Sequence, residues 1–275
     1  MSVEITSRQN PVVRACRELA RDRDGDRVLL DGPHLVEEAL DAGLAFEAVI
    51  ASHAFAAGHA QLVSRLRAHT QVYLADDSVL EGASPVKTAV GIVAIASLPL
   101  EGMRRTLDGT AALAVALVDV QDPGNAGAVM RSVEAAAGTG VIACGETADL
   151  RGWRALRASM GSAFRVPFAE ASVDQLFNDA KVAGAQIVAS TLGAASRDMR
   201  DADLRKPTIL LIGNEGRGLA PALEKRADLR VRIPMHGKVQ SLNAAVSAAV
   251  LLYEAQRQRA SADASATHGA ERSRP

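Results

Sequence analysis

The sequence predicts two α/β units within one chain of 275 residues. Strand-like apolar runs alternate with helical stretches along most of the chain, which is typical of βαβ organisation. Residues 98–110 combine proline, glycine and charge without apolar periodicity, and they divide the chain into two parts. Hydrophobic residues make up 48% of the sequence but aromatic residues only 3%, so we expect cores built from aliphatic side chains.

The first unit is expected over residues 1–100 as a small α/β domain. Its clearest helix begins at Pro33 and ends before Gly43, because proline is favoured in the first turn of a helix and glycine just after its end. The other predicted elements are helices at 12–21 and 60–68 and strands at 28–31, 46–51, 72–75 and 89–96.

The second unit is expected over residues 111–258, after a linker at 101–110. It opens with residues 113–120, which are apolar at almost every position and indicate a buried central strand of a parallel sheet. A closing helix at 243–257 is apolar on nearly all sides, which indicates burial in the core or against a second subunit. Residues 259–275 lose this pattern and are expected to be a disordered tail. The remaining predictions are strands at 141–143, 187–190, 209–212 and 229–233, and helices at 128–137, 153–158, 173–183 and 220–226.

Composition excludes several classes of function. A formal net charge of −1 excludes the global basicity of a nucleic-acid coat protein, although local basic patches stay open. Cys16 and Cys144 lie far apart and the six histidines show no ligand spacing, so we expect neither a disulfide framework nor a metal site. The chain start is not signal-like, and the apolar runs fall short of the ~20 residues of a membrane span, so a cytoplasmic protein without a membrane segment is expected.

Three loops carry the candidate chemistry, because each follows an apolar strand at the edge where open parallel sheets gather ligands. Their sequences are Asp-Pro-Gly-Asn-Ala-Gly-Ala at 122–128, Gly-Asn-Glu-Gly-Arg-Gly-Leu at 213–219, and a loop at 233–243 that ends in Ser-Leu-Asn. Ser241 or a neighbour could cap the last helix. Neither a P-loop nor a G-x-G-x-x-G fingerprint occurs, so the standard nucleotide enzymes are disfavoured.

Taken together and in this order, the loops resemble the three motifs of the SpoU/TrmH family (SPOUT superfamily) of RNA ribose 2′-O-methyltransferases. The first likeness continues through Arg131 and Ser132, and the whole likeness covers about residues 113–256. The first unit is more loosely similar, at 5–11 and 30–39, to the ribosomal-protein-like RNA-binding domain that often precedes this catalytic domain. The resemblance implies a deep trefoil knot, a homodimer, S-adenosylmethionine as cofactor, and an RNA substrate, ribosomal rather than transfer RNA.

The same resemblance implies which residues hold the cofactor, with apolar side chains flanking adenine and backbone groups recognising its edge. Glu215 has two interpretations, because it either binds the cofactor's amine or the substrate, or it caps the following turn. Metal and covalent nucleophile are not required, since the cofactor supplies the electrophile and the protein aligns the reactants. The expected cofactor-binding residues are Thr191, Leu192, Gly213, Asn214, Glu215, Gly216, Ile233, Met235 and Leu242.

By resemblance Arg131 is the catalytic arginine, with Asn125, Ser241 and Asn243 at the other polar positions. A guanidinium with a pKa above ~12 is a donor only, so Arg131 is better suited to hold a phosphate and stabilise an alkoxide than to act as a base. Two alternatives stay open: a knotted methyltransferase acting on a base nitrogen of RNA, and an RNA-binding or ribosome-assembly factor without turnover.

RNA contacts are expected from arginines in two groups. Arg14 and Arg17 recur at helical spacing beside Arg8 and suit phosphate contacts that do not read sequence, the alternative being a solvated helix face. Arg154 belongs to a second triplet, and the adjacent Trp153 is expected to be a packing anchor rather than a base-stacking platform. The sequence leaves open which RNA and which nucleotide are modified, whether an antibiotic-resistance role exists, and the geometry of the dimer.

Overall fold

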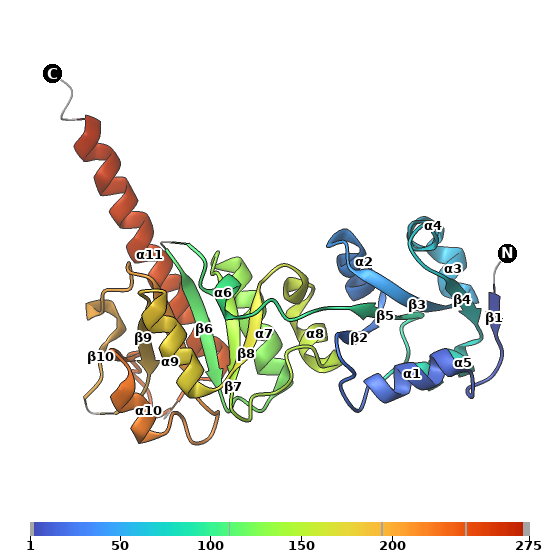
Figure 1. Cartoon of the computed structure of the whole chain (residues 1–275), viewed down its shortest axis with the longest axis horizontal. Coiled ribbons are helices and arrows are strands. Elements are labelled where there is room, and N and C mark those ends of the chain that lie inside the picture. The colour runs from blue at the N-terminus through green and yellow to red at the C-terminus, as the bar shows by residue number, and fades with distance from the viewer. Residues whose placement is uncertain (1–2, 110, 194, 240, 272–275) are drawn as a thin grey trace. The chain divides into compact units, whose positions relative to one another are not determined.

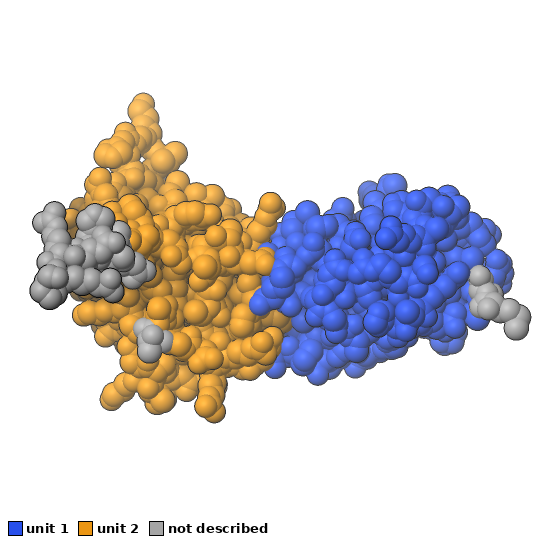
Figure 2. Space-filling view, turned by 90° about the horizontal axis from the view of Figure 1, so that it is seen from above, with its two compact units in different colours: residues 1–100, 149–165 blue, residues 101–148, 166–275 orange. Residues whose placement is uncertain are grey.

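The computed structural model of the chain divides into two compact units, coloured separately in Figure 2. It describes residues 3–109, 111–193, 195–239 and 241–271, with side chains as far as Ser261. Unit 1 consists of Met1–Leu100 and Asp149–Arg165, and unit 2 of Glu101–Ala148 and Val166–Pro275. The chain therefore leaves unit 2 once to add a segment to unit 1.

Unit 1 contains a mixed sheet. Its strands in the described part of the chain are β1 (Val3–Ile5), β2 (Arg27–Asp31), β3 (Ala45–Ser52), β4 (Val72–Ala75) and β5 (Ile92–Ser97). They form one sheet in the order β1-β4-β3-β5-β2, in which β5 runs antiparallel to both of its neighbours (Figure 1). The four predicted strands are confirmed within three residues, whereas β1 is too short to stand out in the sequence.

Helices cover both faces of this sheet. The apolar side chains of α1 and α5 pack together on one face against those of β2, β3 and β5, and Figure 1 shows α2, α3 and α4 on the other face. The three helices predicted here are confirmed, whereas α3 and α5 are too short to show a helical period. Their bounds are α1 Pro11–Leu19, α2 Pro33–Asp41, α3 His53–Gly58, α4 Ala60–Arg67 and α5 Asp77–Ala83.

A further helix of unit 1, α8 (Trp153–Ser159), comes from the added segment. Trp153 packs against the apolar cluster beneath α1 and donates its indole N–H to the carbonyl of Ala20 at 3.2 Å. Arg151 is buried and forms an ion pair with Asp26 at 3.0 Å. Trp153 is thus the packing anchor that the sequence predicts.

Unit 2 contains a parallel sheet. Its strands in the described part of the chain are β6 (Leu113–Val118), β7 (Gly140–Cys144), β8 (Phe168–Ala171), β9 (Gln186–Ser190), β10 (Arg197–Asp198), β11 (Thr208–Ile212) and β12 (Leu229–Arg232). All pairs are parallel, in the order β10-β12-β9-β11-β6-β7-β8. Every residue of β6 is buried, as the sequence predicts, although β11 rather than β6 is the central strand.

Helices also cover both faces of this sheet (Figure 1). One apolar cluster joins the sheet to α6 (Met103–Thr106), α9 (Val173–Val182) and α10 (Pro221–Arg226). On the other face α7 (Pro123–Ala135) packs against α11 (Ala244–Glu271). Residues 101–110, expected as a linker, thus include a short helix that contributes to the core.

The end of the chain also differs from the expectation. α11 continues to Glu271, well beyond residue 257, where the sequence predicts that it ends, and residues 272–275 lie outside the described part. Among the described residues, no helix is both long and apolar enough to cross a membrane.

Helix α7 begins earlier than the sequence predicts, at Pro123 rather than at residue 128. Asp122 caps it by accepting a hydrogen bond from the N–H of Gly124 at 2.7 Å, and Pro123 occupies the first turn. A capping aspartate followed by proline outweighs the low helix propensity of two glycines. The first motif is therefore helical, and Arg131 lies about two turns inside the helix rather than one.

The late part of unit 2 lies against its beginning. α11 packs on α7, and Arg259 in α11 donates to the carbonyl of Ala112 at 3.1 Å. Asn243, just before α11, donates to Asn125 in α7 at 2.8 Å. These contacts are compatible with threading of the C-terminal portion past the first motif, and the trefoil knot stays a prediction.

Candidate functional site

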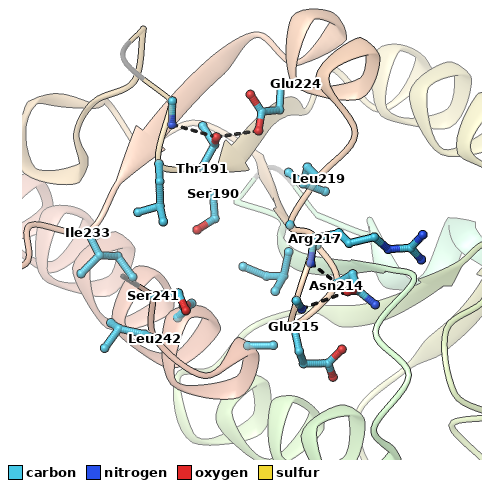
Figure 3. A pocket seen from close by; sticks show the side chains of 18 of the residues that line it. Ser190, Thr191, Asn214, Glu215, Arg217, Leu219, Glu224, Ile233, Ser241 and Leu242 are labelled. Carbon is cyan, nitrogen blue, oxygen red and sulfur yellow. Dashed lines mark hydrogen bonds between the residues drawn. The ribbon is translucent and has the colours of Figure 1, made fainter. Parts of the chain in front are cut away.

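A cavity of about 360 Å³ lies at the carboxyl ends of β9, β11 and β12 (Figure 3). Ligands gather at this edge of parallel sheets, and small-molecule sites typically occupy ~300–1,000 Å³. The fold brings residues from three separate stretches to this one cavity. It is lined by Ser241 and by all nine residues expected to hold a cofactor: Thr191, Leu192, Gly213, Asn214, Glu215, Gly216, Ile233, Met235 and Leu242.

In the turn after β11, the backbone of Gly213 lies close to the backbone of Gly218. A Cβ atom on Gly213 would lie 2.5 Å from backbone carbon of Gly218, so a larger residue does not fit without movement. The side-chain oxygen of Asn214 accepts the N–H groups of Gly216 and Arg217, both at 3.0 Å. These bonds hold closed a turn whose residues form one wall of the cavity.

Asp119, directly after β6, connects this turn to its neighbours, and the sequence does not single it out. Its φ of +56° lies in the left-handed region, which aspartate tolerates better than most residues. Its carbonyl accepts a hydrogen bond from the Asn214 side chain, and its carboxylate accepts the N–H of Glu146, both at 2.8 Å. One unusual backbone position therefore fixes the turns after β11 and β7 together.

The carboxylate of Glu215 points away from the cavity, toward the first motif (Figure 3). It accepts hydrogen bonds from the Asn125 side chain at 2.9 Å and from the backbone N–H groups of Gln121 and Asp122 at 3.4 and 3.3 Å. Burial raises the pKa of this carboxyl, but the hydrogen bonds outweigh burial and hold the pKa below its ordinary value. Glu215 therefore holds the backbone just before α7 and the side chain of Asn125 in its first turn, rather than capping the turn that follows Glu215.

Asn125 links Glu215 to the third motif. It is buried, and its side-chain oxygen accepts the N–H of the Asn243 side chain at 2.8 Å. The oxygen of Asn243 in turn accepts the N–H of Ala245 at 2.9 Å, so this neighbour of Ser241 caps α11 as the sequence predicts. Because a carboxylate only accepts, Asn125 donates to Glu215 and accepts from Asn243. The three motifs are thereby joined by one hydrogen-bonded chain.

Arg131 occupies an exposed position on α7, outside the lining of the cavity. It makes no hydrogen bond or ion pair with any residue that the structure describes. An arginine without an acidic partner keeps its planar set of donors available for a ligand phosphate.

A second pair in the cavity involves a residue that the sequence does not indicate. The hydroxyl of Thr191 donates to Oε1 of Glu224 at 2.6 Å and accepts the N–H of Gly193 at 3.2 Å. Glu224 lies in α10, and its carboxylate borders the cavity (Figure 3). A glutamate five residues beyond the second motif carries no signal, because only the turn between β11 and α10 brings it here.

Two of the arginines expected to contact RNA bind within unit 1. Arg8 donates to the carbonyl of Ser78 at 2.6 Å and forms an ion pair with Glu81 at 3.3 Å, so it packs on α5. Arg17 is half-buried and donates to the carbonyls of Gly82 and Arg8. These side chains attach α1 and the loop before it to α5.

The other two arginines present their charge to solvent. Arg14 is exposed on α1, and its side chain has no hydrogen bond or ion pair within the described residues. Arg154 is exposed on α8, and its guanidinium lies 4.6 Å from the centre of the Trp153 ring. Among the described residues, no group of three histidine, cysteine, aspartate or glutamate side chains could hold a metal ion.

Fold and site together define a class: an α/β protein whose parallel sheet binds a small molecule of mixed polarity at its carboxyl edge, joined to a smaller unit with exposed arginines. The model of the SpoU rRNA Methylase family matches residues 112–253. The chain belongs to this family.

Known proteins resemble the chain over both units. It is 34% identical over 262 residues to the uncharacterized tRNA/rRNA methyltransferase slr1673 of Synechocystis sp., covering 93% of this chain and 94% of the relative. It is 29% identical over 257 residues to the 23S rRNA (guanosine(2553)-2′-O)-methyltransferase RlmP of Bacillus subtilis. The match covers 91% of this chain and 98% of that protein. The crystal structure of the AdoMet-bound rRNA methyltransferase of Sinorhizobium meliloti matches this structure with a TM-score of 0.83 at 32% sequence identity. The match covers 92% of this chain and 97% of that chain.

Proposed function

We propose that this chain is an S-adenosylmethionine-dependent methyltransferase that methylates a ribose 2′-hydroxyl of ribosomal RNA. The observation that carries the proposal is the convergence of the second and third motifs on one cavity, bonded through Asn125 to the helix that presents Arg131. Membership of the family supports it, as do the 2′-O-methylation named for the Bacillus subtilis relative and the AdoMet bound by the Sinorhizobium meliloti relative.

The residues of the cavity fit this cofactor. Because a side chain on Gly213 would collide with the backbone of Gly218, the turn closes only around a glycine, and its residues form one wall of the cavity. Polar side chains suited to hydroxyl and amino acid groups lie at other points of the cavity, at Thr191, Glu224 and Ser241. Apolar surface suited to adenine comes from Ile212, Leu219, Ile233 and Leu242.

When bound, the cofactor supplies a methyl group on a positively charged sulfur. The protein's own task is alignment of the attacking hydroxyl with that methyl group. The chain from Glu215 through Asn125 to Asn243 holds the first and third motifs in fixed register. Arg131 holds an RNA phosphate and stabilises the negative charge that develops on the ribose oxygen as the hydroxyl proton passes to solvent water.

We propose that unit 1 binds the RNA. Arg14 and Arg154 supply exposed positive charge for phosphate contacts, which position RNA without reading its sequence. Arg8 and Arg17 retain further N–H donors beyond those bound within unit 1, and they contribute to the same contact. The relative with a named position acts on 23S ribosomal RNA, which favours ribosomal over transfer RNA.

We also propose that the chain forms a homodimer through unit 2 and works in the cytoplasm. Val246 and Tyr253 of α11 are 47% and 57% exposed, and large apolar side chains at a surface favour association. Cys16 and Cys144 are free and buried, which suits a reducing compartment, and burial raises the pKa of both thiols to about 12.

The variant Arg131→Ala tests the reaction. We expect turnover to fall about 100-fold or more, because a single stabilising donor contributes that much to a developing oxyanion. Affinity for S-adenosylhomocysteine should change less than about twofold, because Arg131 lies outside the cavity. The assay measures tritium transfer from S-adenosylmethionine to unmodified ribosomal and transfer RNA, and calorimetry measures affinity. Arg104→Ala, at another exposed arginine of unit 2, is the matched control.

Mapping of the labelled RNA separates the alternatives. Label in alkali-resistant linkages of ribosomal RNA, lost with Arg131→Ala, supports ribose methylation. Label on a base indicates a methyltransferase for base nitrogens, and cofactor binding without label in any RNA indicates a binding factor. A loss of cofactor affinity equal to the loss of rate contradicts the role given to Arg131.

A further inference from the structure

Glu224 places a carboxylate in the cavity from outside the three motifs. It is half-buried on α10, and Oε1 is bound by the Thr191 hydroxyl at 2.6 Å. Thr191 is itself held by the N–H of Gly193, so the hydroxyl has a defined direction. The carboxylate is therefore fixed in orientation rather than free to turn to solvent.

The other carboxylate oxygen, Oε2, belongs to a residue that lines the cavity. It makes no hydrogen bond or ion pair with any residue that the structure describes. It lies 3.7 Å from the point where a side chain on Gly193 would begin, so the glycine leaves it uncovered. The neighbouring Arg226 does not neutralise it, because that guanidinium binds Asp174 at 2.8 Å and lies over the ring of Phe177.

The chemistry of this oxygen restricts what can bind beside it. A carboxylate only accepts hydrogen bonds, and a ligand that removes water from it without donating one leaves an unsatisfied charge at considerable cost. Acidic side chains bind adenosine ribose hydroxyls in dinucleotide sites for this reason. The ligand must therefore bring an O–H or N–H donor to Oε2.

We propose that Glu224 is a cofactor-binding residue whose Oε2 accepts a hydrogen bond from a donor of S-adenosylmethionine, a ribose hydroxyl or the amino acid ammonium. This inference rests on the proposed function. Thr191 acts as the positioning residue that holds the carboxylate for this contact.

The variant Glu224→Gln tests the contact with little change in shape. The amide keeps an oxygen for Thr191 and replaces Oε2 with an N–H₂ group. A hydrogen-bond donor of the ligand then faces another donor and has no acceptor. We expect the dissociation constant for S-adenosylhomocysteine, measured by calorimetry, to rise about 10- to 100-fold, the usual effect of losing a hydrogen bond to a charged group. Glu101→Gln, which removes a surface charge on the same unit, should leave it unchanged. In both variants the melting temperature of the ligand-free protein should equal that of the wild type.

Smaller ligands identify the donor. Methylthioadenosine lacks the ammonium, so an equal loss of affinity for it in Glu224→Gln assigns the donor to the adenosine part. In that case the wild type should bind 2′-deoxy- or 3′-deoxyadenosine more weakly than adenosine. This loss of affinity should equal the loss that Glu224→Gln causes for adenosine. A loss confined to S-adenosylhomocysteine assigns the donor to the ammonium.

Two results would contradict the inference in distinguishable ways. Equal affinity of wild type and Glu224→Gln for S-adenosylhomocysteine overturns the role of Glu224 and leaves the proposed function standing. No binding of S-adenosylhomocysteine by the wild type overturns the proposed function, and the inference with it.

Discussion

At the scale of residues, the site depends on polar side chains that orient one another. Glu215 accepts three hydrogen bonds, two from the first motif and one from Gln121 just before it, and Asn125 also accepts a hydrogen bond from Asn243. Each of these side chains is fixed by a partner from another motif, so none of the motifs has its final geometry alone. Arg131 differs, because it lies exposed and its guanidinium has no partner among the described residues.

The pKa of Glu215 leads to a pH-dependent prediction. Because the folded protein holds this pKa below the ordinary 4.5, the ionised carboxylate stabilises the fold above that pH, and the contribution is lost as the pH falls through the folded pKa. We expect Glu215→Ala to lower the free energy of unfolding at neutral pH, and the difference from wild type to shrink below about pH 4.5. Urea unfolding at a series of pH values measures it, and a difference independent of pH contradicts the assignment.

At the scale of elements, the turn after β11 is held by close backbone contact. Gly213→Ala should lower the free energy of unfolding by about 1–3 kcal/mol, the usual cost of overpacking, because the new Cβ would lie 2.5 Å from backbone. Gly216→Ala is the matched control, since the nearest non-adjacent atom to its Cβ would be the side-chain oxygen of Asn214 at 3.6 Å. Urea unfolding of the ligand-free variants measures both. Equal destabilisation would show that the close approach at Gly213 does not matter.

Elements could be predicted where a pattern is long enough to show a period. The helix at Pro33 and the buried strand β6 follow directly from capping residues and continuous apolar character. The start of α7 could not be predicted from the sequence, because the glycines at 124 and 127 disfavour a helix locally. Only the cap Asp122 and the following Pro123 favour it. β8 is a short strand whose pairing with β7 depends on the whole sheet.

At the scale of the whole molecule, unit 1 is completed by a segment that follows β7 of unit 2. Trp153→Ala should lower the free energy of unfolding of unit 1 by about 2 kcal/mol or more, through lost packing and a lost hydrogen bond to Ala20. Arg154→Ala, at the adjacent exposed position, should cost only about 0.5–1 kcal/mol, the usual contribution of an exposed cation–π contact such as the one with the Trp153 ring. Native-state hydrogen exchange of the β2 amides measures both. If β2 is equally protected in the two variants, the segment does not stabilise unit 1.

The sequence by itself determined the α/β class and the three motifs that define the family, because apolar periodicity and glycine-rich turns are local features. It also indicated nine residues that share one cavity. Only the tertiary structure decided that Asp149–Arg165 belongs to unit 1, that Glu215 holds the backbone before α7, that Glu224 lines the cavity and that Asp119 holds the turn beside it. The physical reason is that these roles depend on contacts between segments far apart in the chain, which no local pattern records.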